Sequence, residues 1–175
     1  MATFMAIFLF FGFSNAFGEE KEKVETETYG DWALRCPKGK GVKKGPPKQE
    51  DSCVLTQQIM IEKSKSPIVT FVFVYAGKPQ TLHAILRAPL GVALPPGLLL
   101  QIDEDKASSS NWQFNYCEPG GCLAAGRITP QLRKKFQAGK KAQISFRALN
   151  GRTVTVPASL RGVTAGLNAL DKKKR

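Results

Sequence analysis

The four cysteines and their spacing constrain the fold of this chain more than any other feature. Cys117 and Cys122 enclose Glu-Pro-Gly-Gly, and Pro-Gly is a good centre for a tight turn. Four cysteines allow three disulfide pairings, and this turn favours a local Cys117–Cys122 bridge that leaves Cys36 to pair with Cys53. A zinc site with four cysteine ligands is the alternative, but the gap from Cys36 to Cys53 does not fit its usual short pairs. Two disulfides predict a domain that folds in an oxidising compartment.

The first 16 residues are predicted to be a signal peptide. Residues 2–13 form an apolar run of the length of a signal-peptide core, which is too short to cross a bilayer. Small residues precede a cleavage after Ala16, with a second site at Gly18. Because no Lys or Arg precedes the run, an N-terminal strand or a buried helix is the alternative. No other segment is long enough for a membrane span, so we expect an exported chain that is periplasmic, outer-membrane-associated or secreted.

Charge is distributed unevenly along the chain, which has 26 Lys and Arg, 14 Asp and Glu and a net charge of +12. Residues 17–28 carry five acids against two bases and lack apolar periodicity, which predicts a flexible acidic leader. A single domain is expected over residues 29–170, followed by a disordered basic tail at residues 171–175. A net positive charge of this size suggests an anionic partner but does not identify it.

Alternating apolar residues and turn signals predict a mainly β fold, an antiparallel sandwich or barrel. Residues 68–75 are apolar on both faces and are expected at the centre of a sheet. Helices are predicted from Thr129-Pro130 to Gly139 and over residues 159–170, with Ser159 as a candidate cap. Strands are expected at residues 31–36, 53–61, 68–75, 81–88, 98–103, 111–117, 141–149 and 152–156.

Several short motifs, taken in order, are similar to a known family. They are Tyr29–Trp32, Cys53–Gln57, Pro89–Gly97, Ile102-Asp103, Phe114–Cys122 and Ser159–Gly162. Together with both cysteine pairs, they resemble the invasion-associated locus B family of exported Gram-negative proteins over residues 29–170. The resemblance implies an immunoglobulin-like antiparallel β-sandwich, export, and association with host-cell invasion in pathogenic members. It implies no catalytic residues.

Two groups of basic residues are candidate sites for anionic ligands. Five lysines lie between Cys36 and Cys53 with no acid among them, and a second group follows Pro130. Such groups attract phosphates and sulfates in a salt-dependent way, although a solvated basic surface explains them equally well. The candidate residues are Lys38, Lys40, Lys43, Lys44, Lys48, Arg133, Lys134, Lys135, Lys140 and Lys141.

Catalytic and metal chemistry find little support in the residues. His83 is the single histidine, and no Gly-x-Ser-x-Gly motif or C-x-x-C motif accompanies it. Asp103, Glu104 and Asp105 are adjacent acids that could hold calcium, but they lack EF-hand spacing and are interpreted as a solvated turn. We expect a protein that is not an enzyme and has no cofactor and no metal.

These observations favour an exported binding protein that meets lipopolysaccharide, anionic lipid or sulfated glycan through its basic surface. Nucleic acid is a poor partner for an exported protein, and the aromatic residues lie in predicted core strands rather than among the lysines. One alternative is a periplasmic structural or chaperone-like accessory that binds other exported proteins through the apolar stretch 88–100. A hydrolase that depends on His83 is the third hypothesis.

Overall fold

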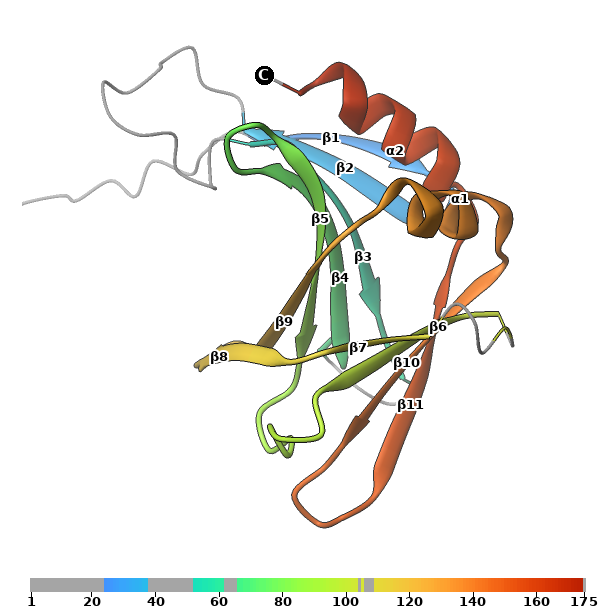
Figure 1. Ribbon diagram of the computed structural model, residues 1–175. Helices are drawn as coiled ribbons and strands as arrows, with labels where there is room; N and C mark the ends of the chain where they lie inside the picture. The colour runs from blue at the N-terminus through green and yellow to red at the C-terminus, as the bar shows by residue number, and fades with distance from the viewer. Residues whose placement is uncertain (1–23, 38–51, 62–65, 104, 106–108, 175) are drawn as a thin grey trace, which may run out of the picture.

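The structure is a computed structural model that describes residues 24–37, 52–61, 66–103, 105 and 109–174. It is mainly β, with two antiparallel sheets, two short helices and two disulfides (Figure 1). The predicted fold class, a disulfide-bonded antiparallel β-sandwich, is therefore confirmed. The predicted signal peptide at residues 1–16 lies outside the described residues and stays a prediction.

The larger sheet has seven strands in the order β1-β2-β3-β4-β5-β9-β8, all antiparallel. β4 lies at its centre, as its apolar sequence predicts, because both of its long edges pair with other strands. The strand bounds are β1 Val24–Tyr29, β2 Trp32–Pro37, β3 Val54–Ile59, β4 Val69–Ala76, β5 Thr81–Ala88, β8 Phe114–Glu118 and β9 Gly121–Arg127.

The smaller sheet has four strands in the order β11-β10-β6-β7. Its strands are β6 Leu98–Ile102, β7 Ser110–Trp112, β10 Lys141–Arg147 and β11 Thr153–Ser159. The single strand expected at residues 111–117 is wrong, because the chain leaves the smaller sheet after Trp112 and enters the larger sheet at Phe114. The alternation of aromatic residues continues across this change of sheet, so the sequence gives no local signal of it.

The two helices are α1 Pro130–Ala138 and α2 Val163–Lys172. The predicted cap of α1 is confirmed, because the Thr129 side chain accepts a hydrogen bond from the Leu132 N–H at 3.1 Å. The predicted cap of α2 is wrong. Ser159 ends β11, where it pairs with Lys141, and α2 begins only after Gly162.

Both predicted boundaries of the domain need correction. The acidic leader was expected to extend to residue 28, but Val24–Tyr29 pair with Trp32–Pro37 as edge strand β1. The basic tail was expected to begin at residue 171, but Asp171 and Lys172 are the last residues of α2. Asp171 also forms an ion pair with Arg133 at 2.6 Å, which holds this end of the chain on the domain.

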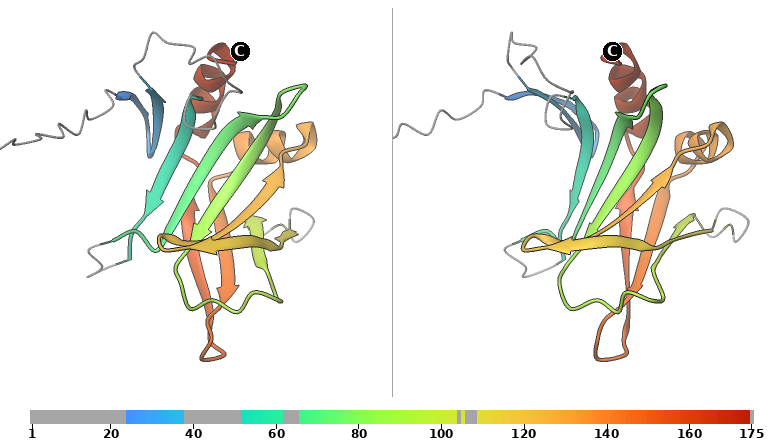
Figure 2. Two further views of the ribbon diagram at one scale, coloured as in Figure 1. Left: turned by 90° about the vertical axis from the view of Figure 1, so that its left-hand side faces the viewer. Right: turned by 60° about the vertical axis from the view of Figure 1, so that its left-hand side comes forward.

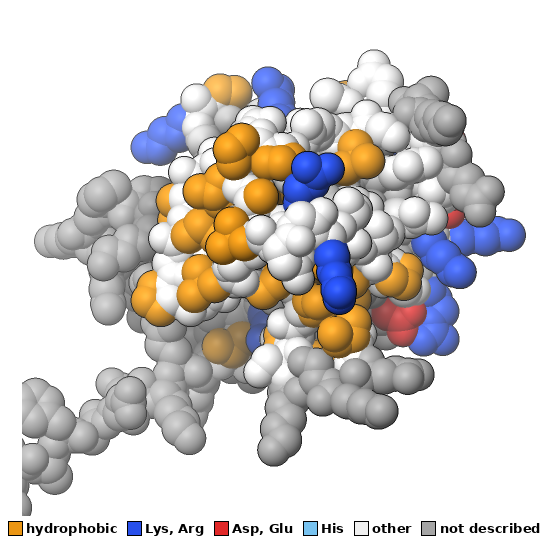
Figure 3. All heavy atoms as spheres, turned by 90° about the horizontal axis from the view of Figure 1, so that it is seen from below, with side chains coloured by type: hydrophobic (Ala, Val, Ile, Leu, Met, Phe, Trp, Pro, Cys, Tyr) orange, Lys and Arg blue, Asp and Glu red, His pale blue; other side chains and the backbone are white. Residues whose placement is uncertain are grey.

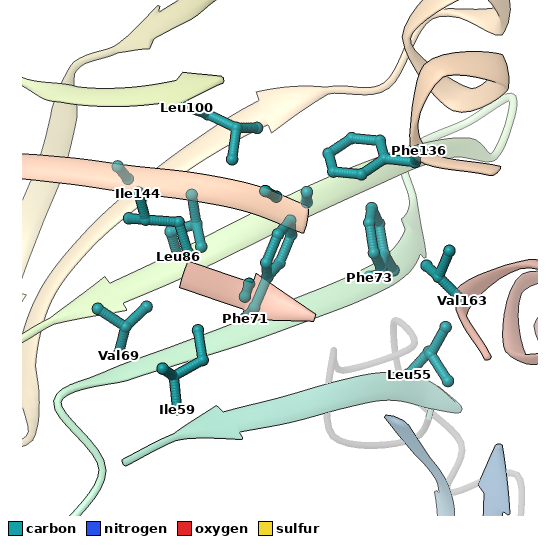
Figure 4. Packing of buried hydrophobic residues seen from close by; sticks show 14 of the residues in the cluster. Leu55, Ile59, Val69, Phe71, Phe73, Leu86, Leu100, Phe136, Ile144 and Val163 are labelled. Atoms are coloured by element: carbon teal, nitrogen blue, oxygen red, sulfur yellow. The ribbon is translucent and has the colours of Figure 1, made fainter. Parts of the chain in front are cut away.

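The core lies between the sheets and extends under the helices. Trp32, Phe71, Phe73 and Phe136 form an aromatic cluster with neighbouring ring centroids 4.9–5.8 Å apart. Figure 4 shows Phe136 of α1, Val163 of α2 and side chains of both sheets pointing toward one another. The burial of these large aromatic side chains is the main source of stability for a domain of this size.

Strand directions give the sandwich two different ends. The β3–β4 and β5–β6 connections and the β8–β9 turn leave the larger sheet at the same end. The β10–β11 hairpin joins them through the bridge between Val92 and Ala148, and we call this the loop end. The opposite end carries α1, α2 and the Cys36–Cys53 disulfide, and we call it the helix end (Figure 1, Figure 2).

Candidate functional site

Both predicted disulfides are present, one at each end of the sandwich. Cys36 bonds to Cys53 at the helix end, and Cys117 bonds to Cys122 across the β8–β9 turn at the loop end. The first candidate group, Lys38, Lys40, Lys43, Lys44 and Lys48, lies outside the described residues. Its flanking residues Pro37 and Ser52 are described, and both are next to the cysteines of the helix-end disulfide.

The second candidate group is brought together at the same end. Arg133, Lys134 and Lys135 lie in α1, while Lys140 and Lys141 follow it at the start of β10. Arg133 pairs with Asp171 at 2.6 Å, and Lys135 pairs with Asp105 at 3.1 Å. Lys134, Lys140 and Lys141 are exposed, and none of their side-chain ammonium groups pairs with an acid among the residues that the structure describes. We call these three residues the free lysines.

The Arg133–Asp171 pair joins α1 to α2 and also engages Tyr75 of β4. Arg133 donates to both carboxylate oxygens of Asp171, at 3.1 and 2.6 Å, and the Tyr75 hydroxyl donates to the same carboxylate at 2.7 Å. Burial raises the pKa of Asp171, but the hydrogen bonds from Arg133 and Tyr75 outweigh it and lower that pKa overall. Burial and the bond to Asp171 raise the pKa of Tyr75. This bidentate pair makes Arg133 a structural residue, with little of its charge left for a ligand.

Sequence reasoning placed three more lysines in a disordered tail. Lys172 ends α2, and Lys173 and Lys174 follow it at the helix end. The Nζ of Lys174 lies 5.0 Å from the centre of the Tyr75 ring, and Lys173 approaches Glu27 at 3.9 Å. The run of lysines was visible in the sequence, but its position depends on the tertiary packing of α2. These residues add positive charge at the same end of the sandwich as the free lysines.

The acidic turn Asp103–Asp105 has a structural role in its described part. The Asp103 carboxylate accepts hydrogen bonds from the backbone N–H groups of Lys140 and Lys141, at 3.0 and 2.9 Å. Asp105 pairs with Lys135. In the described parts of the chain, no three His, Cys, Asp or Glu side chains gather as metal ligands. Asp103 therefore supports the start of β10, and Asp105 holds the turn to α1.

A hydrogen-bonded network, which we call the clasp, ties the start of the domain to its end; it is buried at Trp32 and Gln57 and exposed at Asp31 and Arg161. Its members are Asp31, Trp32, Gln57, Ser159 and Arg161. The indole N–H of Trp32 and the amide of Gln57 both donate to the carbonyl oxygen of Ser159, at 2.9 and 3.1 Å. The Ser159 hydroxyl donates to Asp31 at 2.6 Å, and Arg161 forms a bidentate pair with the same carboxylate. Hydrogen bonds from Arg161 and then Ser159 lower the pKa of Asp31 to about 2.

The clasp brings two glycine backbones into close contact. Gly30 and Gly162 have φ of 58° and 89°, and the Asp31 N–H donates to the Arg161 carbonyl at 3.1 Å. A Cβ atom on Gly162 would overlap the carbonyl oxygen of Tyr29 and lie 2.8 Å from the nitrogen of Gly30. Only glycine fits here, because both the left-handed backbone and the missing side chain are required.

The residues considered for catalysis lie apart from one another. His83 is on β5, where it shares a hydrogen bond of 2.9 Å with the Thr81 hydroxyl, and all four cysteines are in disulfides. A hollow of about 270 Å³ lies on the outer face of the larger sheet, between Gln58, Thr70 and Arg87. Its described lining has no histidine or cysteine, and Arg87 is paired with Glu118 at 2.8 Å. This hollow does not assemble an acid–base pair.

Comparison with protein families identifies the group to which this chain is related. A family model described as invasion associated locus B (IalB) protein matches residues 32–171. The chain belongs to the invasion associated locus B family. The crystal structure of invasion associated protein B from Bartonella henselae matches with a TM-score of 0.70 and 22% sequence identity, over 85% of this chain and 96% of that chain. At this identity the likeness shows a shared fold, and no curated protein matches.

The motifs that resemble the IalB family divide into two kinds in the structure. Tyr29–Trp32 and Ser159–Gly162 meet in the clasp, where their polar groups and glycines hold the domain together. Pro89–Gly97 forms the β5–β6 connection at the loop end and exposes Leu90 and Leu94. Within the described ranges, neither helix has the length and apolar character needed to cross a membrane. Membership of the IalB family does not assign a role to two exposed features, the free lysines at the helix end and the leucines at the loop end.

Proposed function

We propose that the chain is an exported, non-enzymatic binding protein whose helix end meets anionic ligands of the envelope or of a host-cell surface. The observation that carries this proposal is the gathering of the free lysines at the helix end, which also carries the Cys36–Cys53 disulfide that brackets the lysine-rich sequence 38–48. Lys134, Lys140 and Lys141 are exposed, and their ammonium groups have no acidic partner among the described residues. Their charge is available to phosphate or sulfate groups, whereas that of Arg133 and Lys135 is compensated inside the domain.

Export is supported by the signal-like residues 1–16 and by the two disulfides, which form and persist in oxidising compartments. The non-enzymatic role is supported by the position of His83, which bonds to Thr81 rather than to a nucleophile. Contribution to host-cell invasion is part of the proposal because of the family to which the chain belongs. Lipopolysaccharide phosphates, anionic lipids and sulfated glycans all present the required anionic chemistry.

Charge reversal at the helix end tests this function. We expect the disulfide-bonded protein to bind heparin and lipopolysaccharide at low salt, with affinity that falls as salt rises. Lys134→Glu, Lys140→Glu and Lys141→Glu together are expected to weaken binding about tenfold, because exposed charges each contribute a few tenths of a kcal/mol. Surface plasmon resonance over a salt series measures this change.

The control is measured on heparin, which has no acyl chains for the loop end to enter, and compares two reversals at each end: Lys140→Glu with Lys141→Glu, and Arg147→Glu with Arg152→Glu at two exposed arginines of the other end. Equal losses in both variants would mean that net charge alone drives binding, and no binding by the wild type at low salt would reject the proposed ligand class. Binding to lipopolysaccharide but not heparin would assign the role to the bacterial envelope, and the reverse would assign it to host glycans.

A further inference from the structure

Exposed leucines form the tips of the loop end. Leu90 and Leu94 belong to the β5–β6 connection, and Leu149 belongs to the β10–β11 hairpin. Their exposed fractions are 57%, 46% and 75%. Seen from the loop end, hydrophobic side chains gather into a broad apolar surface beside a few basic ones (Figure 3). We call Leu90, Leu94 and Leu149 the leucine tips, and exposed apolar surface of this kind marks a protein or membrane contact.

The leucine tips are presented by backbone that is already hydrogen-bonded. The Ala93 N–H donates to the Arg147 carbonyl at 2.8 Å, and the Leu149 N–H donates to the Gly91 carbonyl at 2.9 Å. Val92 between them is buried and pairs with Ala148, so the connection is fixed to the hairpin. At the turn, Asn150 Oδ1 accepts from the Arg152 N–H at 3.1 Å. These bonds allow the tips to enter an apolar layer without leaving those groups unpaired.

Positive charge surrounds the base of the tips. Arg147 ends β10 and Arg152 precedes β11, so both lie at the foot of the hairpin that carries Leu149. Both are exposed, and neither has an acidic partner within the described ranges. Glu118 is the one acid described at this end, and Arg87 neutralises it at 2.8 Å. The loop end is therefore apolar at its tips and cationic behind them.

We propose that the loop end docks on a lipid surface with anionic headgroups. The leucine tips enter the boundary between headgroups and acyl chains, while Arg147 and Arg152 remain at the level of the phosphates. A lipid surface fits because its own layers follow the same order, with apolar chains beneath anionic groups. This inference goes beyond the proposed function, because it concerns the opposite end of the molecule and requires apolar insertion rather than charge alone.

Vesicle binding by the disulfide-bonded protein tests the proposal. We expect co-sedimentation with vesicles of phosphatidylglycerol and phosphatidylethanolamine. Binding is expected to persist in part at 0.5 M salt, where the Debye length of about 4 Å screens most surface charge. Leu90→Ser with Leu149→Ser is expected to lower the partition coefficient at high salt about a hundredfold, because each inserted leucine contributes about tenfold. Val24→Ser, at an exposed aliphatic residue of β1 near the helix end, is the matched control and is expected to bind as the wild type does.

A second pair of variants tests the cationic base. Arg147→Gln with Arg152→Gln is expected to remove the preference for phosphatidylglycerol over phosphatidylcholine vesicles while the leucine tips stay intact. Failure of the wild type to bind any vesicle, or equal binding by the leucine variant, would overturn the proposal. Loss of binding in the lysine variant of the helix end, with no loss in the leucine variant, would also overturn it and would leave the proposed function standing. Capture of a defined envelope protein by the leucine tips without vesicle binding would assign this end to a protein partner instead.

Discussion

The helix end and the loop end of the sandwich differ in the contacts that hold them together and in the side chains that they expose. At the helix end, the clasp and the Arg133–Asp171 pair lock the first strands, both helices and the last strand together. At the loop end, the backbone is fixed by a few hydrogen bonds and the side chains that it carries are exposed leucines. Stability is therefore concentrated at the helix end, while the loop end is free to specialise in contact with other molecules.

The glycines give the largest expected contrast between the ends. Gly162→Ala is expected to destabilise the fold by about 4 kcal/mol or to prevent folding, because the new Cβ meets the Tyr29 backbone at a left-handed position. Gly91→Ala is the matched variant at the loop end, where φ is 84° and no atom lies within 4 Å of the new Cβ. It is expected to cost about 1 kcal/mol, the conformational penalty alone. Urea unfolding followed by Trp fluorescence measures both, and equal costs would contradict a tighter helix end.

The disulfides give the next contrast. Replacing Cys36 and Cys53 by Ala is expected to cost about 3 kcal/mol, because their bridge spans a sequence separation of 17. Replacing Cys117 and Cys122 by Ala is expected to cost about 2 kcal/mol, because that separation is 5 and a shorter loop removes less entropy from the unfolded chain. The same unfolding experiment ranks the two variants. A larger loss at the loop end would show that the β8–β9 turn needs its bridge for more than chain entropy.

Strands with a strong local pattern were predictable from the sequence. β4 is apolar on both faces and β5 alternates, so local residues determine their places in the sheet. β1 was taken for a leader because most of its residues remain exposed and its pairing with β2 satisfies only one edge. β9 was missed because it is rich in small residues. These residues are small because β9 lies close to the other sheet: a Cβ on Gly126 would lie 2.8 Å from Cδ2 of Trp112 in β7.

The candidate basic residues could be identified from the sequence, but the acidic residues that neutralise some of them could not. The group at Arg133–Lys141 is visible as a run of charge, while the acids that neutralise Arg133 and Lys135 are distant in the sequence. The start of α2 was misplaced for the same reason, since pairing of Ser159 with Lys141 extends β11. The apolar stretch 88–100 was expected to be exposed; this holds for Leu90 and Leu94, while Val92, Leu98 and Leu100 are buried. Leu149 was not noticed, because its position beside Leu90 depends on the bridge between Val92 and Ala148.

The smallest expected effect is the loss of stability at low pH, which acts at the helix end through Asp31 of the clasp. The pKa of Asp31 is about 2 in the fold against 3.8 ordinarily, so its ionised form stabilises the fold above pH 3.8. This contribution is lost as the pH falls from 3.8 through 2, and the carboxyl is protonated in both states only below both pKa values. Asp31→Asn is therefore expected to be less stable than the wild type at pH 7, with a difference that shrinks toward zero as the pH approaches 2. Urea unfolding at pH 7, 4, 3 and 2 measures the difference.

Arg161→Gln provides the second arm, because hydrogen bonds from Arg161 are the largest cause of the lowered pKa of Asp31. It is expected to lose most of the same acid dependence while retaining the backbone contact between Asp31 and residue 161. If Asp31→Asn runs parallel to the wild type at every pH, the carboxylate does not contribute to the clasp. The close backbone contact between Gly30 and Gly162 would then stabilise the helix end without a contribution from the Asp31–Arg161 ion pair.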